Sequence, residues 1–350
     1  MILFDCSDLR HPYCGIYTYI DSLANSLYLQ GASCGADIGF YVPESFRGAF
    51  GETSRYKKMQ GLHRHLFHPG KDVSLFHVTT QFSKFFPNIF RGQILLTVHD
   101  LNYMHGDFPE HTKEKYRRRT LRTFEKADRI VTISEFARQD ILENIDTKGK
   151  KVEMVYNGIT PFTGKLTPPS RIPDRPFLLS VGRVATSKNI HTLPCLLAET
   201  GYSLVIIGRL CDETEVRQIN EEARKWGVED RIIFTGAISE STKHWYFEHC
   251  EAFAMPSLCE GFGIPALEAM LHRKPVFLSD RTSLPEIAGE HAYYFNHDFE
   301  SRAMQEEFMK GMDDFSKGGK DIEAMVAHAQ SFSWENAAKN YIGIYKDMLQ

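Results

Sequence analysis

The stretch Ser257-Leu-Cys-Glu-Gly-Phe-Gly-Ile-Pro-Ala-Leu-Glu-Ala-Met-Leu271 places a glycine turn between two carboxylates and leads directly into a helical pattern. A short apolar run, Ala252–Met255, precedes it and is expected to be a buried strand. Pro265 suits the first turn of a helix, because the N–H that it lacks would have no partner there. The segment therefore predicts a strand, a turn and a helix of an α/β protein.

The same turn has the chemistry of an anion-binding site. Gly261 and Gly263 allow backbone N–H groups to approach a ligand closely, and the helix N-terminus behind them attracts negative charge. Glu260 and Glu268 add two groups that accept hydrogen bonds from hydroxyls. A ligand with phosphates and several hydroxyls, such as a nucleotide sugar, fits this combination.

Short β-branched or aromatic runs alternate with helical patterns along almost the whole chain. This alternation predicts an α/β fold of parallel sheets covered by helices on both faces. Residues 160–176 contain five prolines and no periodicity, so we interpret them as a linker between two doubly wound domains that face a cleft. Strands are expected at 2–5, 38–42, 73–78, 94–98, 130–133, 152–155, 177–181, 204–207, 232–234, 252–255, 276–278 and 293–295.

Composition narrows the class of protein. The 350 residues are 42% hydrophobic and 25% charged, as in globular proteins, and no apolar run approaches the roughly 20 residues that span a bilayer. The apolar N-terminal run has no basic segment before it, so no signal peptide is expected. The seven cysteines include no C-x-x-C pair, which favours a cytoplasmic protein without disulfides or structural zinc.

Charge is distributed unevenly along the chain. Residues 1–165 carry a net charge of +4 and the remainder −8, and residues 113–122 hold most of the basic excess. Two interpretations remain open: a helix that contacts an anionic membrane surface, or a solvated helix face balanced by Glu114 and Glu125. A nucleic-acid partner is not expected, because the total charge is negative and no known binding motif occurs.

Two cations follow the predicted strand Phe177–Val181. Arg183 comes directly after Gly182 at the end of this strand, and Lys188 lies five residues further on. An arginine bridges phosphate oxygens with its planar guanidinium, whereas a lysine acts as a point charge. With the turn at 261–263 these residues could clamp a diphosphate; alone, they could equally be surface cations.

Three other strand ends carry candidate binding groups. His99 follows the strand at 94–98 and could hydrogen-bond to a sugar hydroxyl, although a single histidine is more often structural. Ala237 and Ile238 follow the strand at 232–234 and could offer backbone groups to a base. Gly15 lies between the first strand and its helix, where backbone can meet a phosphate or simply make a tight turn.

Several familiar patterns are absent or unconvincing. No G-x-G-x-x-G follows a strand, and no G-x-S-x-G occurs, which argues against nicotinamide enzymes and α/β hydrolases. The histidines at 63, 65 and 68 lack nearby carboxylates or cysteines in sequence, so no metal site is expected there. No Asp-x-Asp is present, so we expect cations and helix N-termini, and not a metal, to balance a diphosphate.

These motifs resemble the retaining, two-domain (GT-B) glycosyltransferases of the large family that includes bacterial mannosyltransferases and sucrose synthases (glycosyl transferases group 1). The resemblance covers nearly the whole chain, and the loop at 11–15 departs from it by lacking a double glycine. The matching segments are Val98-His-Asp100, Ile133-Ser-Glu135, Tyr156-Asn-Gly-Ile159, Val181-Gly-Arg183 with Lys188, Phe234-Thr-Gly236, Pro256-Ser257, Glu260-Gly-Phe-Gly-Ile-Pro-Ala-Leu-Glu268, Ser283-Leu-Pro-Glu286 and Phe332-Ser-Trp-Glu335.

The resemblance implies two Rossmann-like domains: an acceptor-binding domain at 1–165 and a nucleotide-sugar-binding domain at 166–330. A final helix at 331–350 would cross back onto the first domain. Glu268 would hold the ribose hydroxyls, Glu260 the donor sugar, and His99 would face the transferred sugar. The implied catalytic residues are His99, Arg183, Lys188 and Glu260, and the implied donor-binding residues are Gly15, Gly182, Arg183, Lys188, Ala237, Ile238, Ser257, Glu260, Gly261, Phe262, Gly263, Ile264 and Glu268.

The implied activity is transfer of a hexose with retention of configuration, without a cofactor or metal. Mannose from GDP-mannose is the first choice of donor, and a saccharide or lipid-linked acceptor in bacterial surface polysaccharide or lipopolysaccharide (O-antigen) synthesis is the expected partner. UDP- or dTDP-sugar-dependent transfer, a nucleotide-sugar epimerase and a non-catalytic binding protein are the alternatives. The expected location is cytoplasmic, with peripheral contact at the inner membrane face if the basic helix binds lipid.

Overall fold

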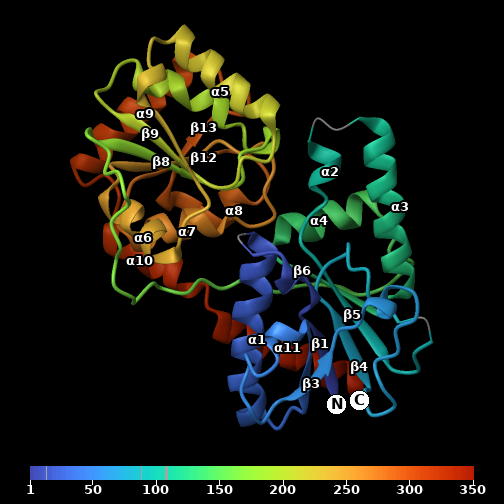
Figure 1. Ribbon diagram of the computed structural model, residues 1–350. Helices are drawn as coiled ribbons and strands as arrows, with labels where there is room; N and C mark the ends of the chain where they lie inside the picture. Colours follow the sequence, from blue (N-terminus) through green and yellow to red (C-terminus); the bar gives the residue numbers. More distant parts are fainter. Residues whose placement is uncertain (13, 88, 107–108) are drawn as a thin grey trace. The chain divides into compact units, whose positions relative to one another are not determined.

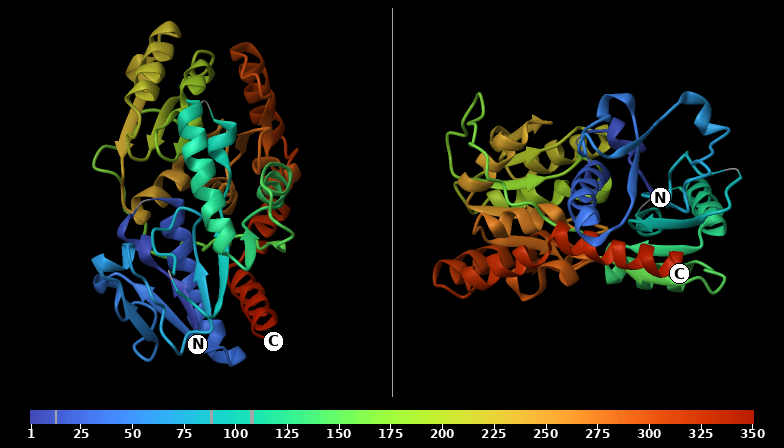
Figure 2. Two further views of the ribbon diagram at one scale, coloured as in Figure 1. Left: turned by 90° about the vertical axis from the view of Figure 1, so that its right-hand side faces the viewer. Right: turned by 90° about the horizontal axis from the view of Figure 1, so that it is seen from below.

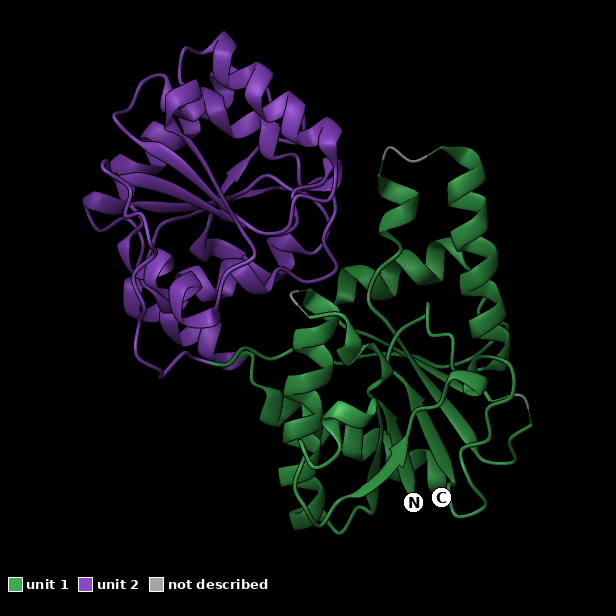
Figure 3. Ribbon diagram, viewed as in Figure 1, with its two compact units in different colours: residues 1–160, 332–350 green, residues 161–331 purple. Residues whose placement is uncertain are grey.

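A computed structural model describes residues 1–12, 14–87, 89–106 and 109–350. The chain divides into two compact units (Figures 1 and 3). Unit 1 comprises residues 1–160 and 332–350, and unit 2 comprises residues 161–331. The divisions thus lie at 160/161 and 331/332, where the sequence suggested 165/166 and 330/331.

Unit 1 contains a parallel sheet with the strand order β3-β2-β1-β4-β5-β6-β7. The order reverses between β1 and β4, which is the topological switch point of a doubly wound sheet. The strands are β1 (Ile2–Asp5), β2 (Ile38–Val42), β3 (Arg55–Lys58), β4 (Leu75–Val78), β5 (Gln93–Val98), β6 (Arg129–Thr132) and β7 (Val152–Met154). The helices are α1 (Gly15–Cys34), α2 (Asn102–His105), α3 (Glu110–Lys126), α4 (Glu135–Asn144) and α11 (Trp334–Leu349), with short 3-10 helices at Ser7–Arg10, Glu44–Phe46 and Gly61–Arg64.

Alternation along β4 and β5 separates the two faces of this sheet. Phe76 and Leu96 belong to an apolar core that includes Phe124 of α3 and Ile141 of α4. The intervening side chains point to the other face, because successive residues of a strand alternate. There, His77 hydrogen-bonds to the hydroxyl of Tyr345 on α11.

Helix α11 belongs to unit 1 although it follows unit 2 in the sequence, and it packs along α1 (Figures 1 and 2). Its N-cap is Ser333, whose hydroxyl accepts from the N–H of Asn336. Buried hydroxyls join it to the sheet and to α1: the hydroxyl of Tyr341 lies 3.1 Å from Oγ1 of Thr97 on β5 and 2.9 Å from the hydroxyl of Tyr19 on α1. The helix is therefore part of the core of unit 1.

Unit 2 contains a second parallel sheet, with the order β10-β9-β8-β11-β12-β13 and its switch point between β8 and β11. The strands are β8 (Phe177–Val181), β9 (Ser203–Ile207), β10 (Ile232–Gly236), β11 (Ala252–Met255), β12 (Val276–Ser279) and β13 (Tyr293–Phe295). The helices are α5 (Glu213–Lys225), α6 (Glu240–His249), α7 (Ile264–Leu271), α8 (Leu284–Ala288), α9 (Ser301–Ser316) and α10 (Ile322–Ser331), with 3-10 helices at Thr186–Lys188, Ile190–Leu197, Glu229–Arg231 and Gly289–His291.

The core of unit 2 lies between its sheet and helices α5 and α9. Leu204 and Ile206 of β9 and Phe277 of β12 are fully buried there with Ile219 of α5 and Phe308 of α9. Burial of both faces explains why the strands are almost continuously apolar. The two units therefore share the doubly wound α/β architecture that the alternating pattern predicted.

One strand was not predicted. β3 consists of Arg55, Tyr56, Lys57 and Lys58, and among the described strands it pairs only with β2. Charged residues are common on an edge strand, where they discourage pairing with other chains, but they give no apolar signal in the sequence. The other expected strands are present with ends shifted by up to two residues.

Candidate functional site

The glycine turn at 261–263 lies beyond the carboxyl end of β11, beside the switch point of unit 2. Gly263 precedes α7 with a φ of 110°, a conformation that side chains of L residues rarely adopt. A Cβ at Gly263 would lie 2.7 Å from Cδ2 of Leu284. Both backbone conformation and space therefore require glycine where the chain enters the helix.

Glu260 is fixed by contacts from several segments of unit 2. Its Oε1 is 2.5 Å from Nζ of Lys188 and accepts a hydrogen bond of 2.8 Å from the hydroxyl of Ser257. Its backbone N–H donates to Oγ1 of Thr282, and Oγ of Ser283 lies 3.0 Å from its carbonyl oxygen. Within the described residues Oε2 makes no hydrogen bond, so it is available to a ligand hydroxyl.

Glu268 lies in the second turn of α7 and, like Glu260, is paired with a lysine through one carboxylate oxygen. Its Oε1 is 2.8 Å from Nζ of Lys243 on α6, and the two side chains are 10% and 15% exposed. Burial raises the pKa of Glu268, and the ammonium of Lys243 opposes that rise. Burial also lowers the pKa of Lys243, but the carboxylates of Glu268 and Glu240 outweigh it, so the pKa of this lysine is raised.

The segment after β8 lies against the segment after β11. Gly182 and Arg183 follow the strand, and the carbonyl of Ser187 accepts a hydrogen bond of 2.9 Å from the N–H of Leu258. A Cβ at Gly208 would lie 1.8 Å from the carbonyl oxygen of Gly182, so backbone packs directly on backbone here. The structure thus brings Lys188 to Glu260 through packing of neighbouring strand ends.

Arg183 differs from Lys188 in its surroundings. It is exposed, and it forms no ion pair with any described residue. An exposed guanidinium without a carboxylate partner can bind an anion without first breaking a salt bridge. Arg183 and Lys188 therefore offer one unpaired and one paired cation at the same strand end.

Ala237 and Ile238 directly follow β10, two strands from β8. Ala237 is exposed and Ile238 is partly buried. They lie at the end of an edge strand of the sheet, and their backbone precedes Ser239, the N-cap of α6. Nothing else distinguishes this edge from other strand ends.

His99 follows β5 in unit 1 and is buried. Its Nε2 donates a hydrogen bond of 2.8 Å to the carbonyl of Thr79, at the end of β4. Burial lowers the pKa of His99 to about 4, so the ring is neutral near pH 7. With the proton on Nε2, its Nδ1 remains an acceptor.

The ring of His99 is also fixed by an aromatic contact. Tyr19 of α1 meets it edge-to-face at 4.7 Å, and the hydroxyl of Tyr19 is hydrogen-bonded to Thr97 and Tyr341. This network joins the end of β5 to helix α1 and to the C-terminal helix α11. The orientation of His99 therefore depends on residues far from it in sequence.

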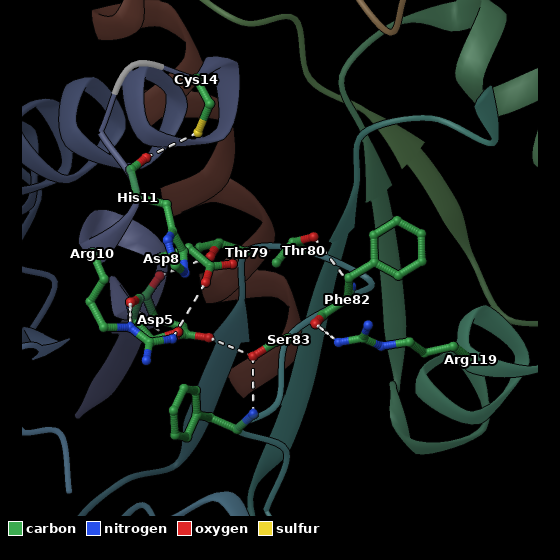
Figure 4. A network of polar contacts seen from close by, with 12 residues as sticks. Asp5, Asp8, Arg10, His11, Cys14, Thr79, Thr80, Phe82, Ser83 and Arg119 are labelled. Atoms are coloured by element: carbon green, nitrogen blue, oxygen red, sulfur yellow. Dashed lines mark hydrogen bonds and ion pairs between the residues drawn. The ribbon is translucent and has the colours of Figure 1, made fainter. Parts of the chain in front are cut away.

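The switch point of unit 1 carries a buried carboxylate (Figure 4). Asp5 accepts hydrogen bonds from the N–H of Ser7 and the hydroxyl of Ser83, and the hydroxyl of Thr79 donates to its carbonyl. Burial raises the pKa of Asp5 to about 7, although the hydrogen bonds with Ser7 oppose this. In the sequence Asp5 does not stand out, because it looks like the last residue of an ordinary strand.

Gly15 begins helix α1, after the loop that carries His11 and Cys14 (Figure 4). In that loop the thiol of Cys14 donates to the carbonyl of His11 at 3.1 Å. A Cβ on Gly15 would meet no atom within 4 Å, so folding does not require glycine here. Tyr13, which belongs to the same predicted loop, lies outside the described residues.

Lys243 is the main site residue that the sequence did not reveal. It lies on α6 within an unremarkable helical pattern, and only the fold brings it to Glu268. Glu240, His244 and Glu268 also approach one another closely enough to share a ligand. Because Nζ of Lys243 is 2.7 Å from Glu240 and 2.8 Å from Glu268, an ammonium already balances these carboxylates.

Two doubly wound units with parallel sheets are the architecture of the GT-B class of glycosyltransferases. Residues 165–331 match the family described as Glycosyl transferases group 1, and residues 41–161 match Glycosyltransferase Family 4. The two matched segments together cover most of the chain, and both belong to glycosyltransferase families, so the chain is a glycosyltransferase whose unit 2 matches group 1.

Solved structures agree with this fold. Sucrose-phosphate synthase from Thermosynechococcus elongatus aligns with a TM-score of 0.75 and 18% identity over 99% of this chain and 98% of its own. HepE from Anabaena, crystallised with UDP-glucose, aligns with a TM-score of 0.73 and 17% identity over 99% of both chains.

Sequence relatives include bacterial mannosyltransferases. The serotype-specific mannosyltransferase WbdA of Escherichia coli is 30% identical over 66% of this chain, and the aligned part spans only 30% of WbdA. O-antigen chain mannosyltransferase B of Escherichia coli is 25% identical over 71% of this chain and 69% of its own length. In the described part of the chain, no helix is both long and apolar enough to cross a membrane.

Proposed function

We propose that this protein transfers a hexose from a nucleotide sugar to a saccharide or lipid-linked acceptor, with retention of configuration and without a metal. Mannose from GDP-mannose is the preferred donor, in the synthesis of a bacterial surface polysaccharide such as an O-antigen. The names of the mannosyltransferase relatives support this choice of sugar.

The arrangement of the two glutamates carries the proposal. In each, Oε1 is taken by a lysine while Oε2 makes no hydrogen bond to a described residue. An ionised carboxylate with one oxygen held is a fixed acceptor for a hydroxyl. Glu260 would bind hydroxyls of the donor sugar, and Glu268 those of the ribose.

The diphosphate, which joins the donor sugar to the ribose, would lie at the N-terminus of α7. Backbone N–H groups at 261–264 and the cations of Arg183 and Lys188 would bind it, with Gly182 and Ser257 shaping the same edge. These groups would stabilise the charge that develops on the leaving diphosphate. Amides and cations would then do the work of a metal.

A covalent route would need a carboxylate nucleophile. Both glutamates are assigned to binding here, so we favour attack from the same face as the leaving group. In this scheme the leaving phosphate accepts the proton of the acceptor hydroxyl. Neutral His99 would hydrogen-bond to the transferred sugar, and the backbone at Gly15 would approach the diphosphate.

The base is the least constrained part of the donor. Ala237 and Ile238 would present backbone groups to it, and such contacts suit guanine or uracil. The structure of HepE with UDP-glucose keeps a UDP-sugar as the second candidate donor.

The basic helix is proposed to contact an anionic membrane surface. α3 exposes Lys115, Arg117 and Arg122 without ion pairs to described residues, whereas Lys113 and Arg118 are paired with glutamates on the same helix. Each exposed cation contributes roughly 1 kcal/mol near an anionic surface. The protein should therefore co-sediment with vesicles that contain 30% anionic lipid at low salt. A variant in which Lys115, Arg117 and Arg122 are replaced by glutamine should remain in the supernatant. Binding of both proteins, or of neither, would rule this surface out.

Donor turnover tests the activity. The protein is first screened for thermal stabilisation by GDP, UDP and dTDP, because a ligand of the native state raises its stability. Consumption of the matching sugar donor is then measured with and without saccharide acceptors. Acceptor-dependent consumption supports a transferase, acceptor-independent turnover indicates an epimerase, and binding without turnover indicates a binding protein.

A further inference from the structure

Lys243 on helix α6 lies beside Glu268, which is in the second turn of α7. Ser239 caps α6 by accepting from the N–H of Thr242, and Lys243 follows on the first turn. Its Nζ lies 2.8 Å from Oε1 of Glu268 and 2.7 Å from Oε2 of Glu240. Glu268 is buried and Lys243 is mostly covered, with 15% of its side chain exposed, whereas Glu240 is 66% exposed.

Among the described residues, Lys243 is the cation in hydrogen-bond contact with Glu268, and His272 lowers the pKa of Glu268 from further away. The nearest alternative, Nε2 of His244, is 4.0 Å away, and burial lowers its pKa to about 3, so the ring is neutral. Behind it, His272 lies 2.9 Å from His244 and is paired with Glu248. Removing Lys243 would therefore leave a carboxylate in a poorly hydrated environment with no ammonium partner.

The pair also fixes the geometry of the carboxylate. Lys243 occupies only Oε1, so Oε2 stays available. The ring of His244 stacks on Phe162 at 4.5 Å and an interplanar angle of 10°, which restrains α6 next to Lys243. The lysine thus approaches Glu268 from a restrained helix.

We propose that Lys243 is a positioning residue for donor binding, which keeps Glu268 ionised and oriented so that Oε2 accepts from the ribose hydroxyls of the nucleoside diphosphate. The proposal rests on the assignment of Glu268 to the ribose under the proposed function. It adds a second lysine to the site, with a different task from Lys188, which is paired with Glu260. Lys243 would act through the carboxylate and need not touch the ligand.

The test measures GDP and UDP binding by calorimetry between pH 6 and pH 8.5 for the parent, Lys243→Met, Lys243→Arg and Glu268→Gln. Lys243→Met should weaken binding about tenfold, because a hydrogen bond to a neutral acceptor is weaker than one to a carboxylate. The loss should grow toward low pH, where the unpaired Glu268 takes up a proton. Lys243→Arg should restore most of the affinity.

Glu240→Gln is the matched control, since it removes the exposed carboxylate from the same ammonium and should change affinity less than twofold. Lys243→Met with Glu268→Gln avoids a buried unpaired charge and should bind no more weakly than Glu268→Gln alone. Additive losses in this double variant, or a Lys243→Met variant with parental affinity and pH profile, overturn the proposal. If Glu268→Gln binds like the parent, the proposed ribose contact fails instead.

Discussion

The switch points of the two sheets carry opposite chemistry. In unit 1 the strand ends hold Asp5 and His99, which are both buried and, with pKa values of about 7 and about 4, are both neutral between these two pH values. In unit 2 the strand ends hold Lys188 with Glu260, the nearby pair of Lys243 with Glu268, and exposed Arg183. The same topology therefore supports a neutral hydrogen-bonding surface in one unit and a charged one in the other.

This difference suggests a division of labour. A diphosphate leaving group develops negative charge, which fixed cations and helix N-termini stabilise. A sugar and its acceptor need oriented hydrogen bonds instead, and a neutral buried imidazole supplies these without the desolvation cost of a charge. On the proposed function, unit 2 binds the charged part of the donor.

The largest effect is expected when a cation at the strand ends of unit 2 is removed. Arg183→Ala and Lys188→Ala should each lower kcat about 100- to 1,000-fold, as loss of one donor to a developing oxyanion typically does. Arg224, an exposed arginine on α5 of the same unit without an ion pair to described residues, is the matched control, and Arg224→Ala should keep parental rates. Parental rates for the Arg183 and Lys188 variants in a donor-consumption assay would refute the electrostatic account.

The next effect separates two glycines. Gly263→Ala should destabilise the protein by about 2–3 kcal/mol, because it forces a strained φ and a contact with Leu284. Gly15→Ala should leave the free energy of unfolding within about 0.5 kcal/mol, since its Cβ has open space. Denaturant unfolding measures both. A lower activity of the stable Gly15→Ala variant would then point to a lost approach of ligand to backbone.

The buried Asp5 should make stability depend on pH. Its folded-state pKa of about 7 is above the unfolded value of 3.8, so the folded state binds more protons between these values. Its contribution is present at low pH and lost as the pH rises through 7, by about 2 kcal/mol between pH 5.5 and pH 7.5. Asp5→Asn should remove this dependence when unfolding is followed at both pH values. An unchanged slope would show that Asp5 does not titrate in this range.

A smaller effect is expected when the neutral imidazole of His99 in unit 1 is replaced. His99→Gln should lower kcat/KM about tenfold, the value of one hydrogen bond of roughly 1.4 kcal/mol. Because burial lowers the pKa of His99 to about 4, the ratio of parent to variant rates should be constant between pH 5.5 and pH 8. A ratio that changes near pH 6.5 would mean that the imidazole titrates in the working enzyme.

The smallest expected effect is none. Treatment with EDTA should leave donor turnover within twofold of the untreated protein, because Lys188 and Arg183 are proposed to balance the charge of the diphosphate in place of a metal. If activity is lost and Mg²⁺ or Mn²⁺ restores it, then a metal balances the charge of the diphosphate, and the proposed role of the cations in unit 2 is wrong.

Sequence patterns predicted much of this molecule. Continuous apolar strands and glycine turns indicated two parallel sheets, because burial on both faces leaves a strong signal. Proximity in the chain also connected Gly261 and Gly263 with the helix that follows. The polar edge strand β3 was missed, since its charged residues carry no hydrophobic signal.

Contacts between distant segments could not be predicted in the same way. Lys243 and Glu268 belong to different helices, and no periodicity in either helix indicates that they meet. Asp5 and Ser83 are joined only because β1 and β4 are neighbours at the switch point. Such pairs depend on strand order, which a single sequence does not encode locally.

The position of α11 has a consequence for how the chain folds during synthesis. Unit 2 is continuous from residue 161 to 331, so all of its segments emerge from the ribosome before α11 does. Unit 1 is complete only when Tyr341 and Tyr345 reach Thr97 and His77. The first unit to be translated is therefore the last to acquire its full core, and a fragment ending at residue 160 would lack the hydroxyl partners that α11 offers to Thr97 and His77.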